Sequence, residues 1–327
     1  RVIVRPRRAP WRASETGQQL VHARIARVLT ALAQEQVRWV IPAGSPLADA
    51  PAGRVRLRVA AGAQPRLRCA LGRLGFLRVP VDRGAGAGFV AYDAPTAGWV
   101  TLRVRPADPG RGRGHWADRV RRAARRLRAR GSLLPRRGLS VALLGPDGAG
   151  KSTLAAGITG TFYFPVEQIY MGLWQGPPAP AGRGYVPGRE IATRLRRAWG
   201  PYLRGRYQQA RGRLVLFDRY TYDALVAVEP DAGWRSRLYY GVLGHACPAP
   251  DLVLVLDVPG TVMYARKGEH SVASLERQRQ RYLGIAAGIR RAVVVDAARP
   301  AAAVQADAVA RIWQAYVAQW SKKRQCR

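Results

Sequence analysis

The sequence predicts an α/β protein in which a domain with a parallel sheet flanked by helices is preceded by a small α+β domain. From Leu139 onward, short apolar runs typical of buried strands alternate with segments of helical periodicity. Before residue 106, strand-like runs of alternating character surround two amphipathic helical segments. We therefore expect a small domain at residues 1–105, an arginine-rich linker with one helix at 106–137, and the larger domain at 138–327.

The small domain is expected to contain two helices and four strands. Apolar residues recur at helical spacing between Leu20 and Leu32, and a second helix is expected near 67–74. Strand-forming runs lie at 37–41, 54–59, 89–92 and 99–104. With Gly44-Ser45 after the first strand and an alternating strand soon after, this part resembles the nucleotidyltransferase-like fold.

The alternating strand departs from that fold in its charges. The fold keeps metal-binding carboxylates there, whereas Arg54, Arg56 and Arg58 stand on one face of the strand in this sequence. Cations cannot ligate a metal. The resemblance therefore implies a degenerate domain that holds no Mg²⁺, transfers no nucleotidyl group, and serves in docking, in anion binding or as a cover for the larger domain.

The charge of the chain is strongly positive. There are 55 Lys and Arg residues against 20 Asp and Glu residues, a net charge of +35, and the linker holds many of the arginines around one helix between Trp116 and Leu127. Such a field attracts nucleotides, nucleic acid or an anionic surface. An arginine-rich composition without a binding role is an equal alternative, and the lack of interleaved aromatic residues favours a solvated basic face for the linker helix.

Cysteine usage and hydropathy predict the compartment. Cys69, Cys247 and Cys326 are far apart and match neither a zinc spacing nor an evident disulfide framework. No stretch approaches the ~18 uninterrupted apolar residues of a membrane span, and no signal-peptide pattern is present at the start. We therefore expect a cytoplasmic protein.

One segment carries a complete phosphate-binding motif. Gly145-Pro146-Asp147-Gly148-Ala149-Gly150-Lys151-Ser152 has the form G-x-x-x-x-G-K-[ST] and lies between an apolar strand at 139–144 and a helix start at 151–156. Glycines let backbone N–H groups converge on phosphate oxygens, the lysine reaches the outer phosphates, and the serine hydroxyl can ligate Mg²⁺. We predict a nucleoside triphosphate site at Gly145, Asp147, Gly148, Ala149, Gly150, Lys151, Ser152 and Thr153.

Later strands of the large domain end in charged residues. Strands are expected at 166–170, at 213–220 with the ending Asp218-Arg219-Tyr220, at 251–257 and at 293–296. Helical segments are expected after Pro259, at the basic stretch 276–282, and at a closing helix whose residues 304, 308, 312, 316 and 320 form a packing stripe. Because ligands of open α/β sheets bind at the carboxyl ends of strands, Asp218 and Arg219 should lie over the phosphate site.

Over roughly residues 139–320 the chain resembles the thymidylate kinase-like family of P-loop kinases. The resemblance rests on the Gly-Pro-Asp-Gly-x-Gly-Lys-Ser-Thr form of the loop, on Asp218-Arg219-Tyr220, on the strand that ends at Asp257, and on Arg266-Lys267-Gly-Glu before an arginine-rich segment. It implies ATP and Mg²⁺ as cofactors, with Ser152 and Asp218 at the metal. It also implies that Asp147 contacts the acceptor's sugar and that Arg219 holds the acceptor's phosphate.

The resemblance also implies a lid that supplies positive charge. The loop contains no arginine, so the transition-state charge should be met from the lid by Arg266, Arg277, Arg279 or Arg281. The implied catalytic set is Lys151, Asp218, Arg219, Arg266, Arg277 and Arg281.

Two departures from the family concern the acceptor. The Arg-Glu-Pro-Gly element after the second strand is absent, and the thymine-reading Ser-x-x-Ala-Tyr-Gln segment is replaced by Thr221-Tyr222-Asp223-Ala224-Leu225. The aromatic residues nearby either stack on a base or sugar or simply pack; they are Tyr170, Trp174, Tyr185 and Tyr222.

The predicted function is ATP- and Mg-dependent phosphoryl transfer to a nucleoside monophosphate, without a unique preference for thymidylate. A kinase for another small hydroxylated or phosphorylated metabolite is the alternative among enzymes. A nucleotide-gated nucleic-acid-binding protein with little turnover is the alternative from another class, and nucleic acid is less favoured as a partner than a small acceptor. The sequence does not decide the oligomeric state.

Overall fold

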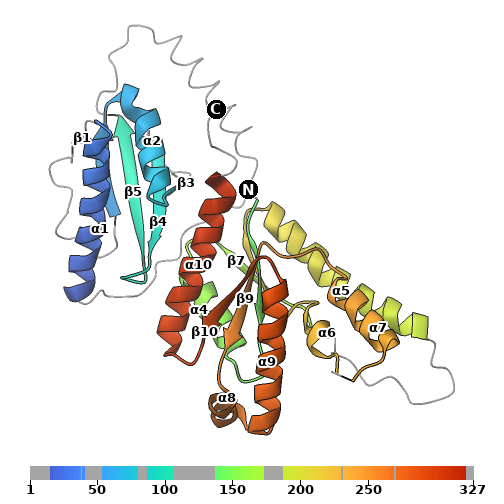
Figure 1. Ribbon diagram of the computed structural model, residues 1–327. Coiled ribbons are helices and arrows are strands. Elements are labelled where there is room, and N and C mark those ends of the chain that lie inside the picture. The colour runs from blue at the N-terminus through green and yellow to red at the C-terminus, as the bar shows by residue number, and fades with distance from the viewer. Residues whose placement is uncertain are drawn as a thin grey trace. The chain divides into compact units, whose positions relative to one another are not determined.

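The computed structural model describes residues 15–37, 39–40, 54–79, 87–106, 137–172, 187–229, 231–268 and 270–321 (Figure 1). The chain divides into two compact units. The described part of the larger unit covers residues 137–308, and that of the smaller unit covers the residues up to 106 together with 309–321. The expected linker helix, Gly44-Ser45, Trp174 and Tyr185 lie outside the described residues.

The larger unit contains a parallel sheet of five strands, called sheet B. The strands are β6 (Ser140–Leu144), β7 (Val166–Tyr170), β8 (Leu214–Asp218), β9 (Leu252–Asp257) and β10 (Ala292–Asp296). Their order is β10-β9-β6-β8-β7, with every neighbouring pair parallel. Because β8 lies on one side of the central β6 and β9 on the other, the crevice of this sheet opens at the carboxyl end of β6. The predicted α/β class is confirmed.

Helices flank sheet B (Figure 1). They are α4 (Lys151–Thr161), α5 (Pro187–Ala210), α6 (Asp223–Val226), α7 (Trp234–Gly244), α8 (Gly260–Lys267), α9 (Val272–Gly288) and α10 (Ala301–Ser321). Val215, Phe217 and Val253 of the sheet share a buried cluster with Ala198 of α5 and Tyr282 of α9. Strands and helices therefore alternate along the chain, as expected for a parallel sheet flanked by helices.

Helix α5 is absent from the sequence-based expectations. Its sequence is rich in arginine and is interrupted by Gly200, Pro201 and Gly205, which are signals of loops and turns. Ala198 is nevertheless fully buried, so tertiary packing outweighs the local signals. Within the part of the chain that the structure describes, no helix has the length and apolar character required to cross a membrane.

The smaller unit is an α+β structure around sheet A. Its elements are α1 (Glu15–Gln34), β1 (Trp39–Val40), β2 (Arg54–Val59), a 3₁₀ turn (Ala61–Ala63), α2 (Gln64–Arg73), β3 (Leu77–Val79), β4 (Ala87–Asp93) and β5 (Gly98–Pro106). The order is β1-β2-β5-β4-β3, with β2 and β5 parallel and the other pairs antiparallel. Val28 of α1 and Leu67 of α2 pack with Leu57 and Leu102 in one core, so both helices cover the same face of the sheet.

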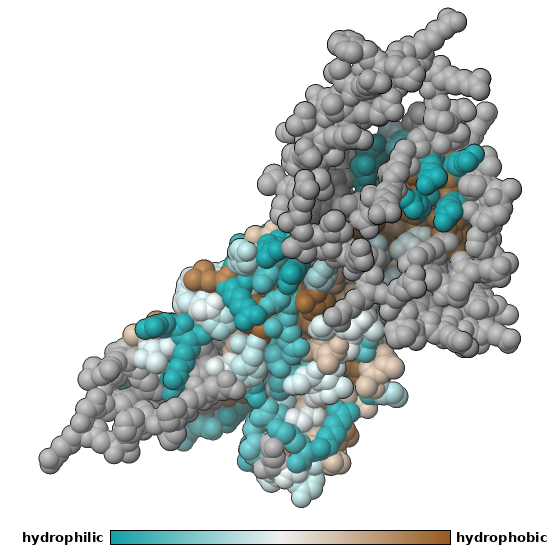
Figure 2. All heavy atoms as spheres, turned by 180° about the vertical axis from the view of Figure 1, so that it is seen from behind, coloured by the Kyte–Doolittle hydropathy of each residue, from teal (hydrophilic) through white to brown (hydrophobic). Residues whose placement is uncertain are grey.

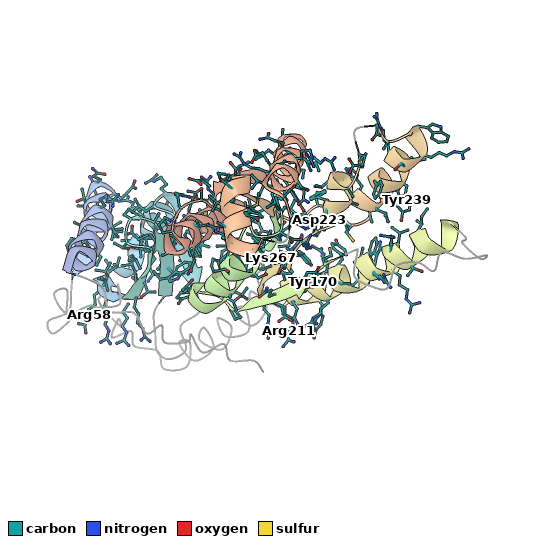
Figure 3. The ribbon with its side chains drawn as sticks, turned by 90° about the horizontal axis from the view of Figure 1, so that it is seen from below. Arg58, Tyr170, Arg211, Asp223, Tyr239 and Lys267 are labelled. Carbon is teal, nitrogen blue, oxygen red and sulfur yellow. The ribbon has the colours of Figure 1, made fainter. Side chains whose placement is uncertain are left out.

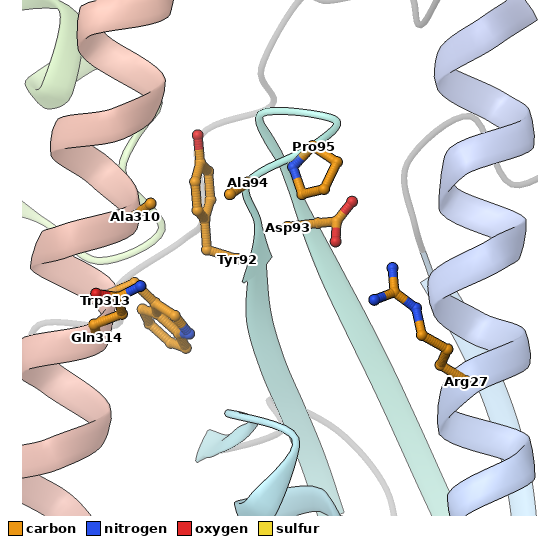
Figure 4. A pocket seen from close by; sticks show the side chains of 8 residues that line it. All are labelled: Arg27, Tyr92, Asp93, Ala94, Pro95, Ala310, Trp313 and Gln314. Carbon is orange, nitrogen blue, oxygen red and sulfur yellow. The ribbon is translucent and has the colours of Figure 1, made fainter.

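The last turns of α10 also belong to the smaller unit. The indole Nε1 of Trp313 donates a hydrogen bond to the Gly75 carbonyl at 3.1 Å, and its ring packs edge-on against Trp99 with centroids 5.0 Å apart. A cavity of about 220 Å³ lies beside Trp313, and Arg27 and the buried Asp93 are among its lining residues (Figure 4). The expected stripe of α10 is confirmed at positions 304, 308, 312 and 316, which are buried.

Candidate active site

The phosphate-binding motif forms the turn between β6 and α4. Gly145, Gly148 and Gly150 have φ angles of 148°, 86° and 90°, which residues with a side chain rarely adopt. The Ala149 N–H closes the turn on the Pro146 carbonyl at 3.3 Å. A Cβ added at Gly148 would lie 3.1 Å from the Met263 carbonyl oxygen of α8. Glycine is therefore required both by the backbone and by the close approach of α8.

Lys151 begins α4, and its ammonium group lies inside the loop. Its Nζ donates to the carbonyl oxygens of Gly145 at 2.7 Å and Pro146 at 2.8 Å, and it lies 3.6 Å from Oδ1 of Asp147. Burial and the neighbouring Arg219 charge lower the pKa of Lys151. The loop carbonyls and one carboxylate thus hold the lysine at the N-terminus of α4, where the helix dipole and exposed N–H groups favour an anion.

Asp218 lies at the carboxyl end of β8, next to the loop that follows β6. It is buried, and its Oδ2 accepts a hydrogen bond from the Ser152 hydroxyl at 3.5 Å. The parallel pairing of β6 with β8 brings these two residues together from positions 66 apart in the sequence. A hydroxyl and a carboxylate are oxygen donors of the kind that Mg²⁺ prefers. The glycine turn, Lys151 and this oxygen pair fit a nucleoside triphosphate with its magnesium ion.

Arg219 bridges the loop and the segment after β8. Its Nη2 donates to Asp147 at 2.5 Å and its Nη1 donates to Asp223 at 3.4 Å. The backbone has a φ of 69°, and its N–H is bonded to the Leu143 carbonyl of β6 at 3.2 Å, which fixes this unusual conformation. Burial alone would raise the pKa of Asp147, but the charges of Arg219, Lys151 and Lys267 hold it below its usual value.

Asp223 and Tyr282 complete the site, and sequence reasoning did not select them. The Tyr282 hydroxyl of α9 donates to Oδ1 of Asp223 at 3.0 Å. Burial raises the pKa of Asp223, and the charges of Arg219 and Lys151 only partly oppose this effect. A signal that could have identified Asp223 is that it is an acidic residue close in sequence to Arg219, in the segment that follows the end of β8. Figure 3 labels Asp223 near the middle of the larger unit.

The structure separates the predicted lid arginines into groups. Arg266 lies beside the loop, because its Nη1 would be 3.9 Å from a Cβ at Gly150, and its Nη2 donates to the Ala297 carbonyl at 3.2 Å. Arg279 is bound to Asp257 at 2.5 Å and to Glu276 at 2.8 Å. Arg281 is bound to the exposed Glu229 at 2.6 Å.

Arg277 is exposed, and its charge helps to lower the pKa of Glu229. Arg266 is thus beside the phosphate-binding loop, whereas Arg279 and Arg281 are bound to carboxylates outside it.

The described aromatic residues differ in their availability. Tyr222 is buried and packs against Tyr220 with ring centroids 5.3 Å apart, and burial raises its pKa. Tyr170 is 44% exposed at the end of β7, and its side chain lies over Gly172. Tyr170 is thus free to meet a ligand, whereas Tyr222 belongs to the core.

No protein-family model matches the sequence, and no curated relative matches it. One similar solved structure is described as thymidylate kinase from Candida albicans, with a TM-score of 0.42 and 17% sequence identity over 58% of this chain and 94% of that chain.

Proposed function

We propose that this chain transfers the γ-phosphoryl group of ATP to a small anionic acceptor, with a nucleoside monophosphate as the first candidate. The observation that supports this proposal most directly lies at the carboxyl end of β6 and β8, where Lys151 and Arg219 both contact Asp147, and Ser152 contacts Asp218. Phosphoryl transfer depends mainly on positioning and on cations that neutralise spread negative charge.

Each residue of the cluster has a role in this proposal. The loop and Lys151 bind the triphosphate, while Ser152 and Asp218 hold Mg²⁺, which would neutralise charge on the phosphates when bound. Arg219 exchanges a carboxylate partner for the anionic group of the acceptor, and Asp147 contacts an acceptor hydroxyl. Arg266 faces the loop and supplies charge from α8.

A non-nucleotide acceptor is the second candidate, and the segment after β8 favours it. Tyr222 is buried in the core, and Asp223 is directed to Arg219 and Tyr282. These two residues occupy the part of the sequence that reads thymine in the thymidylate kinase-like family. A phosphorylated sugar or another hydroxylated metabolite needs the anion-binding arginine but no base-reading segment.

The test is an acceptor panel with ATP and Mg²⁺ in which ADP and phosphorylated product are both measured. The panel contains the nucleoside monophosphates, sugar phosphates and matched compounds without the phosphate. Phosphorylation of several monophosphates with little base preference supports the first candidate, and phosphorylation of sugar phosphates alone supports the second. Binding of ATP with no acceptor-dependent ADP from any compound would contradict the proposal.

A further inference from the structure

Sheet A has an arginine face on the side opposite α1 and α2, formed by Arg56 and Arg58 of β2 with the half-buried Arg103 and the exposed Arg105 of β5. In the parallel register of these strands Arg56 is the partner of Arg103 and Arg58 is the partner of Arg105. Val55, Leu57 and Val59, which alternate with them, are buried in the core under α1 and α2. The alternation therefore directs the arginines away from α1 and α2, and Figure 3 shows Arg58 on that side.

Nothing in the described part of this unit neutralises Arg56, Arg58 or Arg105. All three are exposed. The acidic side chains described nearby are occupied elsewhere, because Glu35 is bound to Arg73 and the buried Asp93 accepts a hydrogen bond from Thr96 at 2.8 Å. Like charges directly opposite on neighbouring strands destabilise a sheet. Figure 2, the view from behind, shows hydrophilic side chains grouped on this unit at the upper right.

The aromatic residues of the sheet are used in packing. On the same face, Trp99 packs against Tyr92 at 4.9 Å and against Trp313 at 5.0 Å. On the helical side, Trp39 and Phe89 pack in the core. Single-stranded nucleic acids are usually bound by aromatic side chains on which the bases stack. Because the described rings on this face pack against one another, the face offers mainly cations to a ligand. Such a face suits a ligand that exposes its phosphates and keeps its bases inside a duplex.

We propose that the arginine face of sheet A is a docking surface for the phosphodiester backbone of a double-stranded nucleic acid. Same-face arginines repeat every two residues, about 6.6 Å along a strand, and neighbouring strands are about 4.8 Å apart. The face thus forms a compact grid of guanidinium groups, which bind phosphate oxygens with two parallel hydrogen bonds. Contacts of this kind position a duplex without reading its sequence. This proposal does not depend on the kinase function.

The test compares two double variants of the full chain that remove the same charge. Arg56→Gln/Arg58→Gln removes half of the arginine face. Arg66→Gln/Arg68→Gln removes two exposed arginines from α2 of the same unit and serves as the matched control. Fluorescence anisotropy with a short labelled DNA duplex measures the association constant as a function of salt. Thermal unfolding of each variant shows that it is folded.

The expected change is in the salt dependence. Each lost phosphate contact lowers the slope of log K against log salt by about 0.9 for a duplex, so the first variant should lose about 1.8. When salt rises from 50 to 200 mM, the affinity of both proteins falls. The factor of this fall should be about twelve times smaller for the first variant than for the wild type. The control should keep the wild-type slope. A duplex of a different sequence should bind equally well.

Three outcomes would overturn the proposal. The first is an equal loss of slope in both variants, which would indicate that the overall positive charge of the unit, and not the arginine face, attracts the duplex. The second is tighter binding of the same sequence as a single strand. The third is an effect of Arg56→Gln/Arg58→Gln on binding to vesicles with anionic lipid but not on binding to the duplex, which would identify the face as a membrane contact.

Discussion

Sheet B and sheet A both carry basic side chains, but these side chains differ in their burial and in their charged partners. At the carboxyl edge of sheet B, Lys151 is buried and contacts Asp147, while Arg219 lies between Asp147 and Asp223. On sheet A, by contrast, Arg56 and Arg58 are exposed and lie opposite other arginines. An unpaired buried charge costs several kcal/mol, whereas an exposed charge keeps its water.

Sheet B therefore carries a preorganised site, whereas sheet A carries a charged surface. The cations of sheet B are held by carboxylates and carbonyls of the protein itself, so the fold sets their positions. The arginines of sheet A keep their mutual repulsion, which an anionic partner from outside would relieve. We therefore expect the paired charges of sheet B to act on reaction and stability, and the exposed Arg56 and Arg58 to act through repulsion and binding.

Lys151→Ala should have the largest effect on activity. Loss of a preorganised cation at the phosphates should lower turnover by roughly two or more orders of magnitude. Acceptor-dependent formation of ADP measures the change, and thermal unfolding verifies the fold. Lys151→Met, which retains most of the side-chain volume, should show the same loss. Unchanged turnover in either folded variant would remove Lys151 from the mechanism.

Arg219 variants should weaken the use of the acceptor more than the binding of ATP. Arg219→Ala removes a charged hydrogen-bond donor, and Arg219→Lys keeps the charge but loses the two-pronged contact with Asp147 and Asp223. We expect kcat/KM for the acceptor to fall about 10- to 100-fold, the equivalent of one hydrogen bond to a charged group. Kinetics at saturating ATP and a separate ATP titration distinguish the two effects.

The matched control for Arg219 is at the other end of the same strand. Arg213 is half-buried and is paired with Glu167 at 3.0 Å, away from the carboxyl edge of sheet B. Arg213→Ala should leave the KM of the acceptor unchanged. If Arg213→Ala and Arg219→Ala raise that KM equally, Arg219 acts through the stability of β8 and not through contact with the acceptor.

The sequence predicts the phosphate-binding loop and its two strand partners because these features are local. The glycines at 145, 148 and 150 are needed by the backbone, and the apolar runs at 140–144 and 214–218 are buried over their whole length. Asp218 could be located because strand ends meet at one edge of a parallel sheet. Its direct contact with Ser152 follows from the pairing of β6 with β8.

Other parts of the site and fold could not be predicted, because they depend on distant contacts. The bond between Asp223 and Tyr282 joins positions 59 apart, and no local pattern marks either residue as a partner of the other. The arginines at 266, 277, 279 and 281 form one basic stretch in the sequence. Carboxylates on different elements, Asp257 and Glu229, divide that stretch in the structure.

Tyr282→Phe should destabilise the larger unit without removing packing volume. The lost hydroxyl leaves the buried Asp223 carboxylate with one donor fewer, and an unsatisfied buried polar group costs about 1–3 kcal/mol. Chemical denaturation measures the free energy of unfolding. Tyr264→Phe, at an exposed tyrosine of α8, should change it very little. Equal free energies for Tyr282→Phe and wild type would mean that the hydroxyl does not support Asp223.

Arg58→Thr should give the smallest effect and the opposite sign. Arg58 lies opposite Arg105 in the register of β2 and β5, and both side chains are exposed. Threonine is favoured in strands, and the substitution removes a like-charge pair, so we expect a gain of about 0.2–1 kcal/mol in unfolding free energy. The gain should shrink at high salt, which screens exposed charges.

Arg66→Gln on α2 serves as the control for Arg58→Thr. A loss of stability in Arg58→Thr would show that this arginine has a stabilising contact within the unit. The charge of Arg58 would then not be available to bind an external anion.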